Sequence, residues 1–199
     1  MDNNLTLKVK EFAYSIGADL VGIANVERYA NAPIQMSPQG ILPTAKSVVV
    51  CAIHHPDAAI ELDGEVHPQV IGPYRVQYSM NNKLDYMSFA IARMLDRLGH
   101  QAVPIASSNI WRYRGYKELD ATFAPDISHI YSGVCAGLGE LGWNGLCITP
   151  EYGARNRFVS IITDADVMEQ SYLPLMAAQA TDSFLTAIFG SGKSSGAAC

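Results

Sequence analysis

The sequence predicts an α/β (α+β) fold, a single domain in which helices flank a mixed central sheet, and three observations predict it. Residues 5–16 and residues 78–99 carry apolar side chains at helical spacing, so each helix has one face to bury. Residues 47–53, SVVVCAI, are apolar without interruption, which is typical of a strand buried on both faces. The chain has 199 residues, enough for one domain with a sizeable core.

Composition narrows the classes of function. Hydrophobic residues make up 49% of the chain and charged residues 17%, which is typical of a globular protein. The net charge is −5 and basic residues do not cluster, so we expect no nucleic-acid partner. No apolar run approaches the ~20 residues of a membrane-spanning helix, and residues 1–12 lack the apolar core of a signal peptide. We therefore expect no membrane partner and a cytoplasmic location.

The cysteines and histidines do not form the pattern of a metal site. The four cysteines are isolated, with no Cys-x-x-Cys pair, so we expect neither a zinc site nor an iron–sulfur cluster in this chain. Cys51 lies inside the apolar run and is expected to be a small core residue. His54 and His55 follow that run, and adjacent strand residues point to opposite faces, so they do not bind one metal together.

The first half of the chain is predicted to run as helix, strand, loop and strand. Gly17 is a natural end for the first helix. Residues 19–24, DLVGIA, are predicted to form a short strand, and residues 25–45, with three prolines, a loop with one short turn of helix. The buried strand over residues 47–53 follows. Residues 57–73 then combine charges with glycine and proline, which indicates a surface excursion.

Residues 78–99 give the clearest helix in the chain. Its start is predicted at a cap on Ser79 or Asn81, and its end at Gly99. Asp85 is then expected in the first turns, where the helix dipole favours a carboxylate. The apolar stripe consists of Leu84, Met87, Ile91, Met94, Leu95 and Leu98.

A strand and a polar segment are expected after this helix. Residues 101–106, QAVPIA, are predicted to form the strand, which is followed by Ser107, Ser108 and Asn109. Small polar residues at a strand end commonly form turns. Residues 111–120, WRYRGYKELD, mix aromatic and charged side chains. The acidic balance of the chain favours a solvated surface or a pocket rim there over a contact with RNA.

The densest run of glycines lies between a helix predicted over residues 126–138 and a strand predicted over residues 157–163. Glycine adopts positive φ and lets other atoms approach its backbone. The run therefore forms either tight turns that join a helix to a hairpin, or a loop that holds a ligand against its main chain. Its five glycines are Gly137, Gly139, Gly142, Gly145 and Gly153.

This run carries a resemblance to known proteins. The segments AGLGELG (136–142), NGL (144–146) and ITPEYG (148–153), with Arg155-Asn156-Arg157, closely resemble the corrinoid-binding segment of reductive dehalogenases. They resemble that of epoxyqueuosine reductases more loosely, and a weaker resemblance extends over residues 5–164. The resemblance implies a nitroreductase-like fold, a cobalamin cofactor without a protein ligand to cobalt, and a homodimer.

The resemblance also implies which residues bind the cofactor. A corrin ring is broad, mostly apolar and fringed with amides, so it requires close backbone approach, apolar walls and polar partners. Either arginine would meet the phosphate of the nucleotide tail, or would face solvent. Trp143 departs from the polar or basic residues of the dehalogenases. The implied cofactor-binding residues are Ser107, Ser108, Asn109, Gly137, Leu138, Gly139, Leu141, Gly142, Asn144, Gly145, Leu146, Tyr152, Gly153, Arg155 and Arg157.

Four residues are candidates for the proton donor. In epoxyqueuosine reductases the proposed donor is the aspartate of an Asp-Tyr pair that follows a tyrosine, and Tyr78 with Asp85-Tyr86 is similar, with one extra residue between. In reductive dehalogenases the donor is a tyrosine, which leaves Tyr78, Tyr86 and Tyr131 as candidates. A phenol has an ordinary pKa near 10, so it needs a nearby cation or cofactor to donate.

The resemblance ends near residue 164. It divides the chain into a corrinoid-binding domain over residues 1–164 and a divergent tail over residues 165–199, in which residues 173–189 are compatible with a helix. In both families the next segment carries cysteine clusters for two iron–sulfur centres, and this tail has none.

Three hypotheses about function follow. The first is a cobalamin-dependent reductase that acts on a small molecule and takes electrons from an external donor. The second is a non-catalytic corrinoid-binding or carrier protein, and the third is a truncated remnant of a reductase. A flavin is the alternative cofactor for such a fold.

Overall fold

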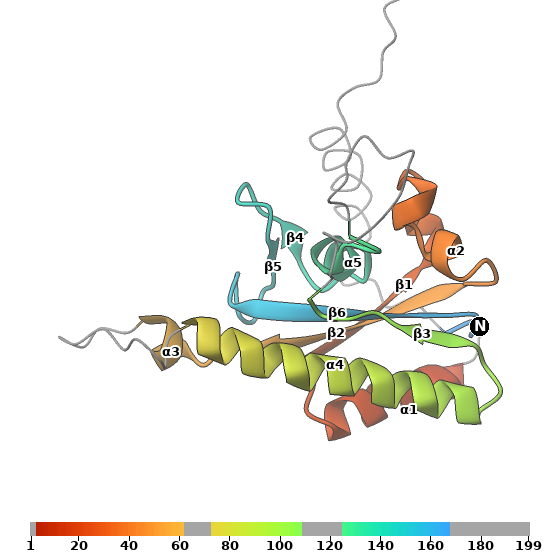
Figure 1. Cartoon of the computed structure of the whole chain (residues 1–199), viewed down its shortest axis with the longest axis horizontal. Coiled ribbons are helices and arrows are strands. Elements are labelled where there is room, and N and C mark those ends of the chain that lie inside the picture. Colours follow the sequence, from red (N-terminus) through yellow and green to blue (C-terminus); the bar gives the residue numbers. More distant parts are fainter. Residues whose placement is uncertain (1–2, 62–72, 109–124, 168–199) are drawn as a thin grey trace, which may run out of the picture.

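The computed structural model describes residues 3–61, 73–108 and 125–167, which form one domain of helices layered on a sheet (Figure 1). The sheet has the strand order β1-β2-β6-β3, and each pairing within it is antiparallel. Its strands are β1 (Leu20–Asn25), β2 (Ser47–His54), β3 (Ala102–Pro104) and β6 (Asn156–Thr163). The predicted fold class, a sheet flanked by helices in one domain, is confirmed, but the sheet that was expected to be mixed is antiparallel in each described pairing.

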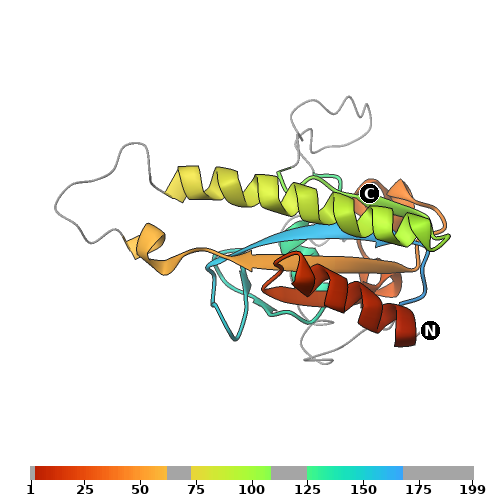
Figure 2. The same cartoon turned by 90° about the horizontal axis from the view of Figure 1, so that it is seen from below.

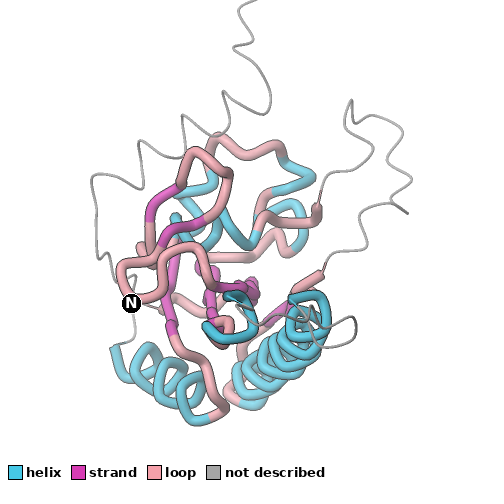
Figure 3. Tube along the Cα trace, turned by 90° about the vertical axis from the view of Figure 1, so that its left-hand side faces the viewer, coloured by secondary structure: helices cyan, strands magenta, loops and turns pink. Residues whose placement is uncertain are grey.

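Each face of the sheet carries its own helices. The helices α1 (Asn3–Ser15) and α4 (Pro73–Arg97) cover one face and lie side by side there (Figures 2 and 3). On the other face lie α5 (His129–Cys135) and a hairpin of β4 (Glu140–Leu141) and β5 (Cys147–Ile148) (Figure 1). The short helices are η1 (Val26–Tyr29), η2 (Ile34–Met36), α2 (Pro38–Ile41) and α3 (Asp57–Glu61).

The strand predicted to be buried on both faces occupies the centre of the sheet. The first seven residues of β2 are buried, and β1 and β6 pair with its two edges. Because strand side chains alternate, Val49 and Cys51 join the core beneath α1 and α4, while Val48 and Val50 join the core beneath α5. The apolar run of β2 therefore contributes alternate side chains to two separate cores.

The long helix differs from its prediction at its beginning. It starts at Pro73, whose fixed φ suits a first helical turn, and not near Ser79 or Asn81. Ser79 lies inside the helix, and its hydroxyl donates to the Arg75 carbonyl at 3.3 Å. Asp85 consequently lies near the middle of α4, too far from the N-terminus to interact with the dipole as predicted.

The end of α4 was predicted correctly, and its apolar stripe was predicted in part. Gly99 has φ +88°, and His100 N–H donates to the Leu95 carbonyl at 3.1 Å, which closes the helix. Leu84 and Ile91 are fully buried, whereas Leu98 is 47% exposed because it lies beyond the last turn that faces the sheet.

The remaining elements refine the predicted boundaries. The helix expected over residues 126–138 covers only His129–Cys135, and the Ser128 hydroxyl caps it by accepting from Tyr131 N–H at 3.2 Å. Ala165 and Val167 are buried beneath α1 and α4, so the core extends past the predicted boundary at residue 164.

Several predictions fall outside the described residues. These are the role of Asn109, the surface segment at residues 111–120, the helix at residues 173–189 and most of the excursion at residues 57–73. Among the described residues, no helix combines the length and the apolar character needed to cross a bilayer.

Candidate functional site

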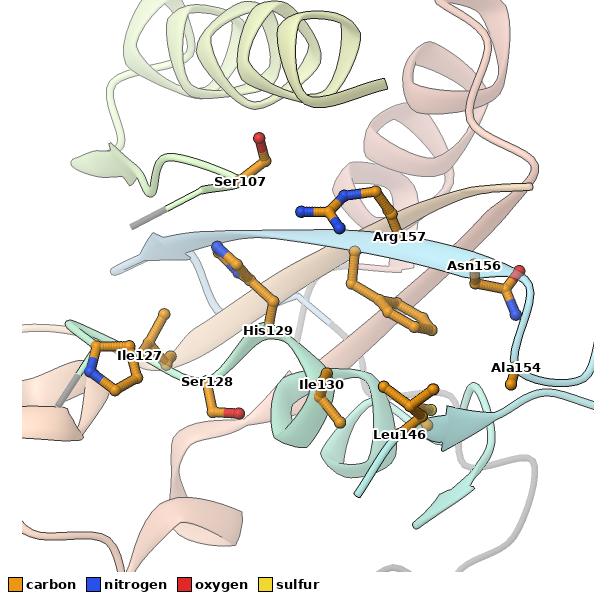
Figure 4. Close-up of a pocket in the computed structure, with 12 residues that line it drawn as sticks. Ser107, Ile127, Ser128, His129, Ile130, Leu146, Ala154, Asn156 and Arg157 are labelled. Atoms are coloured by element: carbon orange, nitrogen blue, oxygen red, sulfur yellow. The ribbon is translucent and has the colours of Figure 1, made fainter. Parts of the chain in front are cut away.

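A cavity of about 260 Å³ opens where β3 ends and β6 begins (Figure 4). The pairing of β3 with β6 stops at Pro104–Ile161, and the Ile105 N–H still donates to the Ser160 carbonyl at 3.1 Å. The earlier residues of β6 have no strand on that side, which leaves the space. Its lining residues are Ser107, Pro125, Ile127, Ser128, His129, Ile130, Leu146, Cys147, Ala154, Asn156, Arg157 and Phe158.

The segment after β3 is tied to α4 at the cavity wall. Ser107 N–H donates to Asp85 Oδ1 at 2.7 Å, and the Ser107 hydroxyl donates to the Asn81 carbonyl at 3.1 Å. Ser107 is buried as a result, whereas its neighbour Ser108 is exposed. The mid-helix position of Asp85 is thus explained by a contact 22 residues away and not by the helix dipole.

His129 is held at the cavity wall by both ring nitrogens. Nε2 lies 2.8 Å from the Ala106 carbonyl, and Nδ1 lies 2.9 Å from Ser160 Oγ. Because a carbonyl only accepts, we assign the proton to Nε2 and let Nδ1 accept from the Ser160 hydroxyl. Burial lowers the pKa of His129, and the nearby Arg157 lowers this pKa further. The neutral ring therefore joins α5 to the loop after β3.

Two arginines at the start of β6 have opposite surroundings. Arg155 Nη1 donates to Asp57 Oδ1 at 2.6 Å and to Glu61 Oε1 at 2.9 Å, which raises the Arg155 pKa. Arg157 forms no hydrogen bond or ion pair with a described residue, its Nε is buried, and burial lowers its pKa. In Figure 4 the Arg157 side chain extends towards the space between Ser107 and His129.

Three more buried polar atoms at this end of the sheet have no partner in the part of the chain that the structure describes. They are His55 Nδ1, Asn81 Oδ1 and Asn156 Oδ1. The Asn156 amide nitrogen is bonded, since it donates to Thr149 Oγ1 at 3.0 Å and to the Gly153 carbonyl at 2.8 Å. Burial lowers the pKa of His55, and Arg157 and His54 add to this effect. Native proteins rarely leave buried polar atoms unpaired, so the grouping is informative.

The first part of the glycine-rich run forms the tight turns that were one of its two interpretations. Gly137 has φ +70° and ends α5, with Leu138 N–H donating to the Gly133 carbonyl at 3.0 Å. A Cβ on Gly139 would overlap the Ile148 carbonyl, and one on Gly142 would come within 2.7 Å of Asn144 Oδ1. Gly139 is therefore required by the backbone of the hairpin itself, whereas Gly142 is crowded only by the side chains of Asn144 and Ile148.

The glycine-rich run does not converge on one space. Gly137, Leu138 and Gly139 line a second cavity of about 140 Å³ against β1 and α1, whereas Leu146 lines the first. Gly145 and Gly153 have φ +74° and +59° and face open space.

The other predicted cofactor contacts in this run have local roles. Asn144 Oδ1 accepts from Leu146 N–H at 3.1 Å, and Leu141 packs against the core beneath α5. The Tyr152 ring stacks on His54 at 4.4 Å, and Trp143 is fully exposed.

The structure separates the four candidates for the proton donor. Tyr131 is 4% exposed and its ring lies edge-on to Tyr29 at 6.4 Å, inside the core beneath α5. Tyr78 and Tyr86 are 59% and 68% exposed on α4. The Asp85 carboxylate accepts a hydrogen bond from the backbone of Ser107, which lines the cavity.

Comparison with known proteins places the chain near two groups of reductases. No protein-family model matches the sequence. Tetrachloroethene reductive dehalogenases of Desulfitobacterium hafniense and Dehalobacter restrictus are each 31% identical to it over 122 residues, or 61% of this chain. The chain spans only 18% of the length of these relatives.

Solved structures show the same fold. An epoxyqueuosine reductase from Bacillus subtilis has a TM-score of 0.58 at 18% identity, over 84% of this chain and 47% of that one. A reductive dehalogenase whose structure suggests a mechanism for B12-dependent dehalogenation has a TM-score of 0.52 at 15% identity, over 82% and 20%. The resemblance to these two families predicted from the sequence is confirmed.

Proposed function

We propose that this chain is a cobalamin-dependent, reductase-type domain similar to reductive dehalogenases, and that the corrinoid contacts it at the cavity between β3 and β6. One observation carries the proposal. Ser107, Leu146 and Arg157, three residues implied by the resemblance to bind the cofactor, come from three separate segments and line the same cavity. The similarity to a dehalogenase described as B12-dependent supports the choice of cofactor.

The donor chemistry of the cavity fits the edge of a corrin. Within the described part of the chain, the Arg157 Nε–H donor and the Asn156 Oδ1 acceptor have no partner, and an amide fringe supplies partners for both. Leu146 and Ile130 offer apolar contacts beside them. The volume of about 260 Å³ lies below the roughly 300–1,000 Å³ of ordinary ligand pockets. The described residues therefore fit an edge of the ring and not its whole area.

The residues of this chain would bind and orient the cofactor and a small-molecule substrate. Cobalamin, when bound, supplies the reducing centre. Ser107 is fixed by Asp85 and His129 closes the wall behind it, so the cofactor-facing surface is formed in advance. Asp85 is the proton-donor candidate that the geometry favours, because it is hydrogen-bonded to a residue of the wall. Electrons would come from an external donor.

A non-catalytic corrinoid carrier is the second candidate. The exposure of Tyr78 and Tyr86 and the burial of Tyr131 favour it, since none of the three lines the cavity. Turnover of organohalides by the cobalamin-loaded protein with a chemical reductant would favour the reductase, and binding without turnover the carrier.

Titration with cobalamin, followed by visible absorbance, tests the proposed site. Leu146 is 39% exposed at the cavity, so Leu146→Arg should leave the fold intact and weaken cobalamin binding by about tenfold or more. Leu7→Arg makes the same change at a 53% exposed position of α1 and should bind like wild type. Equal cobalamin affinity in all three proteins would show that this cavity is not part of the cofactor site. The spectrum of bound flavin, after incubation with flavin, would show that the cofactor is a flavin and not cobalamin.

A further inference from the structure

The start of β6 contains a partly buried cation that has no counter-ion among the described residues. No described carboxylate pairs with Arg157, although Arg155, two residues earlier, contacts two of them. A guanidinium keeps its charge in proteins, so it cannot avoid the cost of burial by losing a proton. An unpaired buried charge is among the costliest groups in a folded chain. The position therefore calls for an anion.

Two neutral histidines, His55 and His129, lie close enough to Arg157 to feel its charge, and the Asp85 carboxylate also acts on His129. The charge of Arg157 disfavours protonation of both His55 and His129, which shows that the three groups are electrostatic neighbours. His55 Nδ1 is also buried and unpartnered among the described residues. An anion that enters here meets a free guanidinium and at least one imidazole nitrogen able to bind a proton.

The rest of the cavity is apolar, which indicates the shape of the ligand. Ile127, Ile130, Leu146 and Phe158 line it together with Arg157. A fully hydrated inorganic ion would gain nothing from these side chains, whereas a hydrocarbon body would be removed from water by them. The volume of about 260 Å³ admits a body the size of a single aromatic ring.

We propose that this cavity binds the carboxylate of a small organic acid, with Arg157 as its counter-ion and the four apolar side chains around its hydrocarbon part. A guanidinium pairs with a carboxylate through two parallel hydrogen bonds, which a single free arginine suits well. This names a substrate or effector class for the proposed function, and it rests on that function only for the identity of the site. Arg157 then pairs with the acid in place of the corrin fringe, and Leu146 and Asn156 remain for the edge of the corrin.

Titration with three probes, followed by the imidazole NMR signals of His129, tests the inference. Benzoate should bind and shift these signals, while benzyl alcohol and inorganic phosphate should bind at least about tenfold more weakly, because each lacks one of the two contacts. Arg157→Gln should weaken benzoate by about tenfold to a hundredfold, and Arg157→Lys by less. Arg93→Gln removes an exposed arginine from α4 and should bind benzoate like wild type.

Two outcomes would overturn the inference. Equal binding of benzoate and benzyl alcohol would show that the cavity does not select for charge. The second is that benzoate fails to bind while Arg157→Gln weakens cobalamin but not cobinamide, which lacks the nucleotide tail. Arg157 would then meet the cofactor phosphate, and the proposed function would stand. Benzoate binding that depends on Arg157, in a protein that does not bind cobalamin, would instead sustain the inference and refute the proposed function.

Discussion

The two ends of strand β6 differ in the hydrogen bonding of their buried polar groups. At its C-terminal end the Thr163 hydroxyl donates to the Gln101 carbonyl at 2.8 Å and accepts from Ala165 N–H at 3.1 Å, and Asp164 Oδ1 accepts from Gln101 N–H at 2.9 Å. At its N-terminal end four buried polar atoms have no partner among the described residues. They belong to His55, Asn81, Asn156 and Arg157.

The two ends of β6 therefore differ in whether the described residues satisfy their buried polar groups. Each unpaired buried polar group costs free energy that a folded protein recovers only through a partner. One strand of eight residues therefore has a structural end, closed by its own hydrogen bonds, and an end whose partners must come from outside the described residues. We infer that a ligand completes the second end.

Thr163→Val should produce the largest loss of stability among the changes considered. It leaves the shape of the side chain intact but removes both hydrogen bonds of the hydroxyl at the closed end. The free energy of unfolding in urea should fall by about 1–3 kcal/mol. Thr44→Val removes an exposed hydroxyl that also forms a hydrogen bond with Gln101. It should change the free energy of unfolding by less than about 0.5 kcal/mol. Equal losses of stability in the two variants would mean that burial does not strengthen the hydrogen bonds of Thr163.

Ser160→Ala should lower the free energy of unfolding by less, because Ser160 lies midway along β6 and its hydroxyl forms one hydrogen bond, to His129. His129 Nδ1 would lose its donor at 2.9 Å while Nε2 keeps the Ala106 carbonyl. We expect a loss of about 1 kcal/mol in urea unfolding. If the loss is absent, His129 is not locked as described, and the cavity wall is less ordered than the hydrogen bonds indicate.

The dependence of the free energy of unfolding on pH should reveal His129 and His55, the histidines near Arg157. Burial lowers the folded-state pKa of His129 and His55, with Arg157 acting on both, His54 adding to the effect on His55, and Asp85 opposing it at His129. The unfolded chain then binds more protons just below the ordinary histidine pKa of about 6.5. Their contribution is present above that pH and is lost as the pH falls towards the folded pKa values.

Urea unfolding between pH 7.5 and 5 measures this contribution. Wild type should lose stability on acidification, and His129→Gln should lose less, because one of the two groups is gone. A slope in the variant as steep as in wild type would show that His129 does not contribute.

Arg157→Met should have the smallest effect on the free energy of unfolding, and this effect should be opposite in sign to those of the other changes. Removing an unpaired, partly buried charge should leave the free energy of unfolding unchanged or raise it. Asn156→Ala is the matched change at the neighbouring residue, whose amide is bonded, and should lower it. Destabilisation by Arg157→Met would indicate a structural partner for Arg157 and would remove the asymmetry between the two ends.

The fold could be predicted from the sequence where burial dominates. The six apolar residues from Val48 to Ile53 predict a central strand, and the apolar stripe from Leu84 to Leu95 predicts a helix that covers it. The start of α4 was missed because Ser79 and Asn81 are good caps that also fit inside a helix when tertiary contacts hold it. Local propensity alone does not distinguish the two.

The candidate site could be predicted only in part. Glycines at positive φ were expected, but the packing of Gly139 against Ile148 depends on a hairpin register that the sequence does not display. The pairing of Arg155 with Asp57 spans 98 residues. His55 and His129 were not predicted as site residues, because distant contacts place them. The pairing of β2 with β6 places His55, and the packing of α5 against β6 places His129. Alternation along β6 was the one signal that could have separated Arg157 from Asn156.

A crystal structure of the chain grown with cobalamin tests the central claim most directly. The account predicts that an edge of the corrinoid lies against Leu146 and that a polar group of the ligand comes within hydrogen-bond distance of Arg157 Nε or Asn156 Oδ1. A corrinoid bound elsewhere, with the polar atoms at the start of β6 still unpaired, would contradict it.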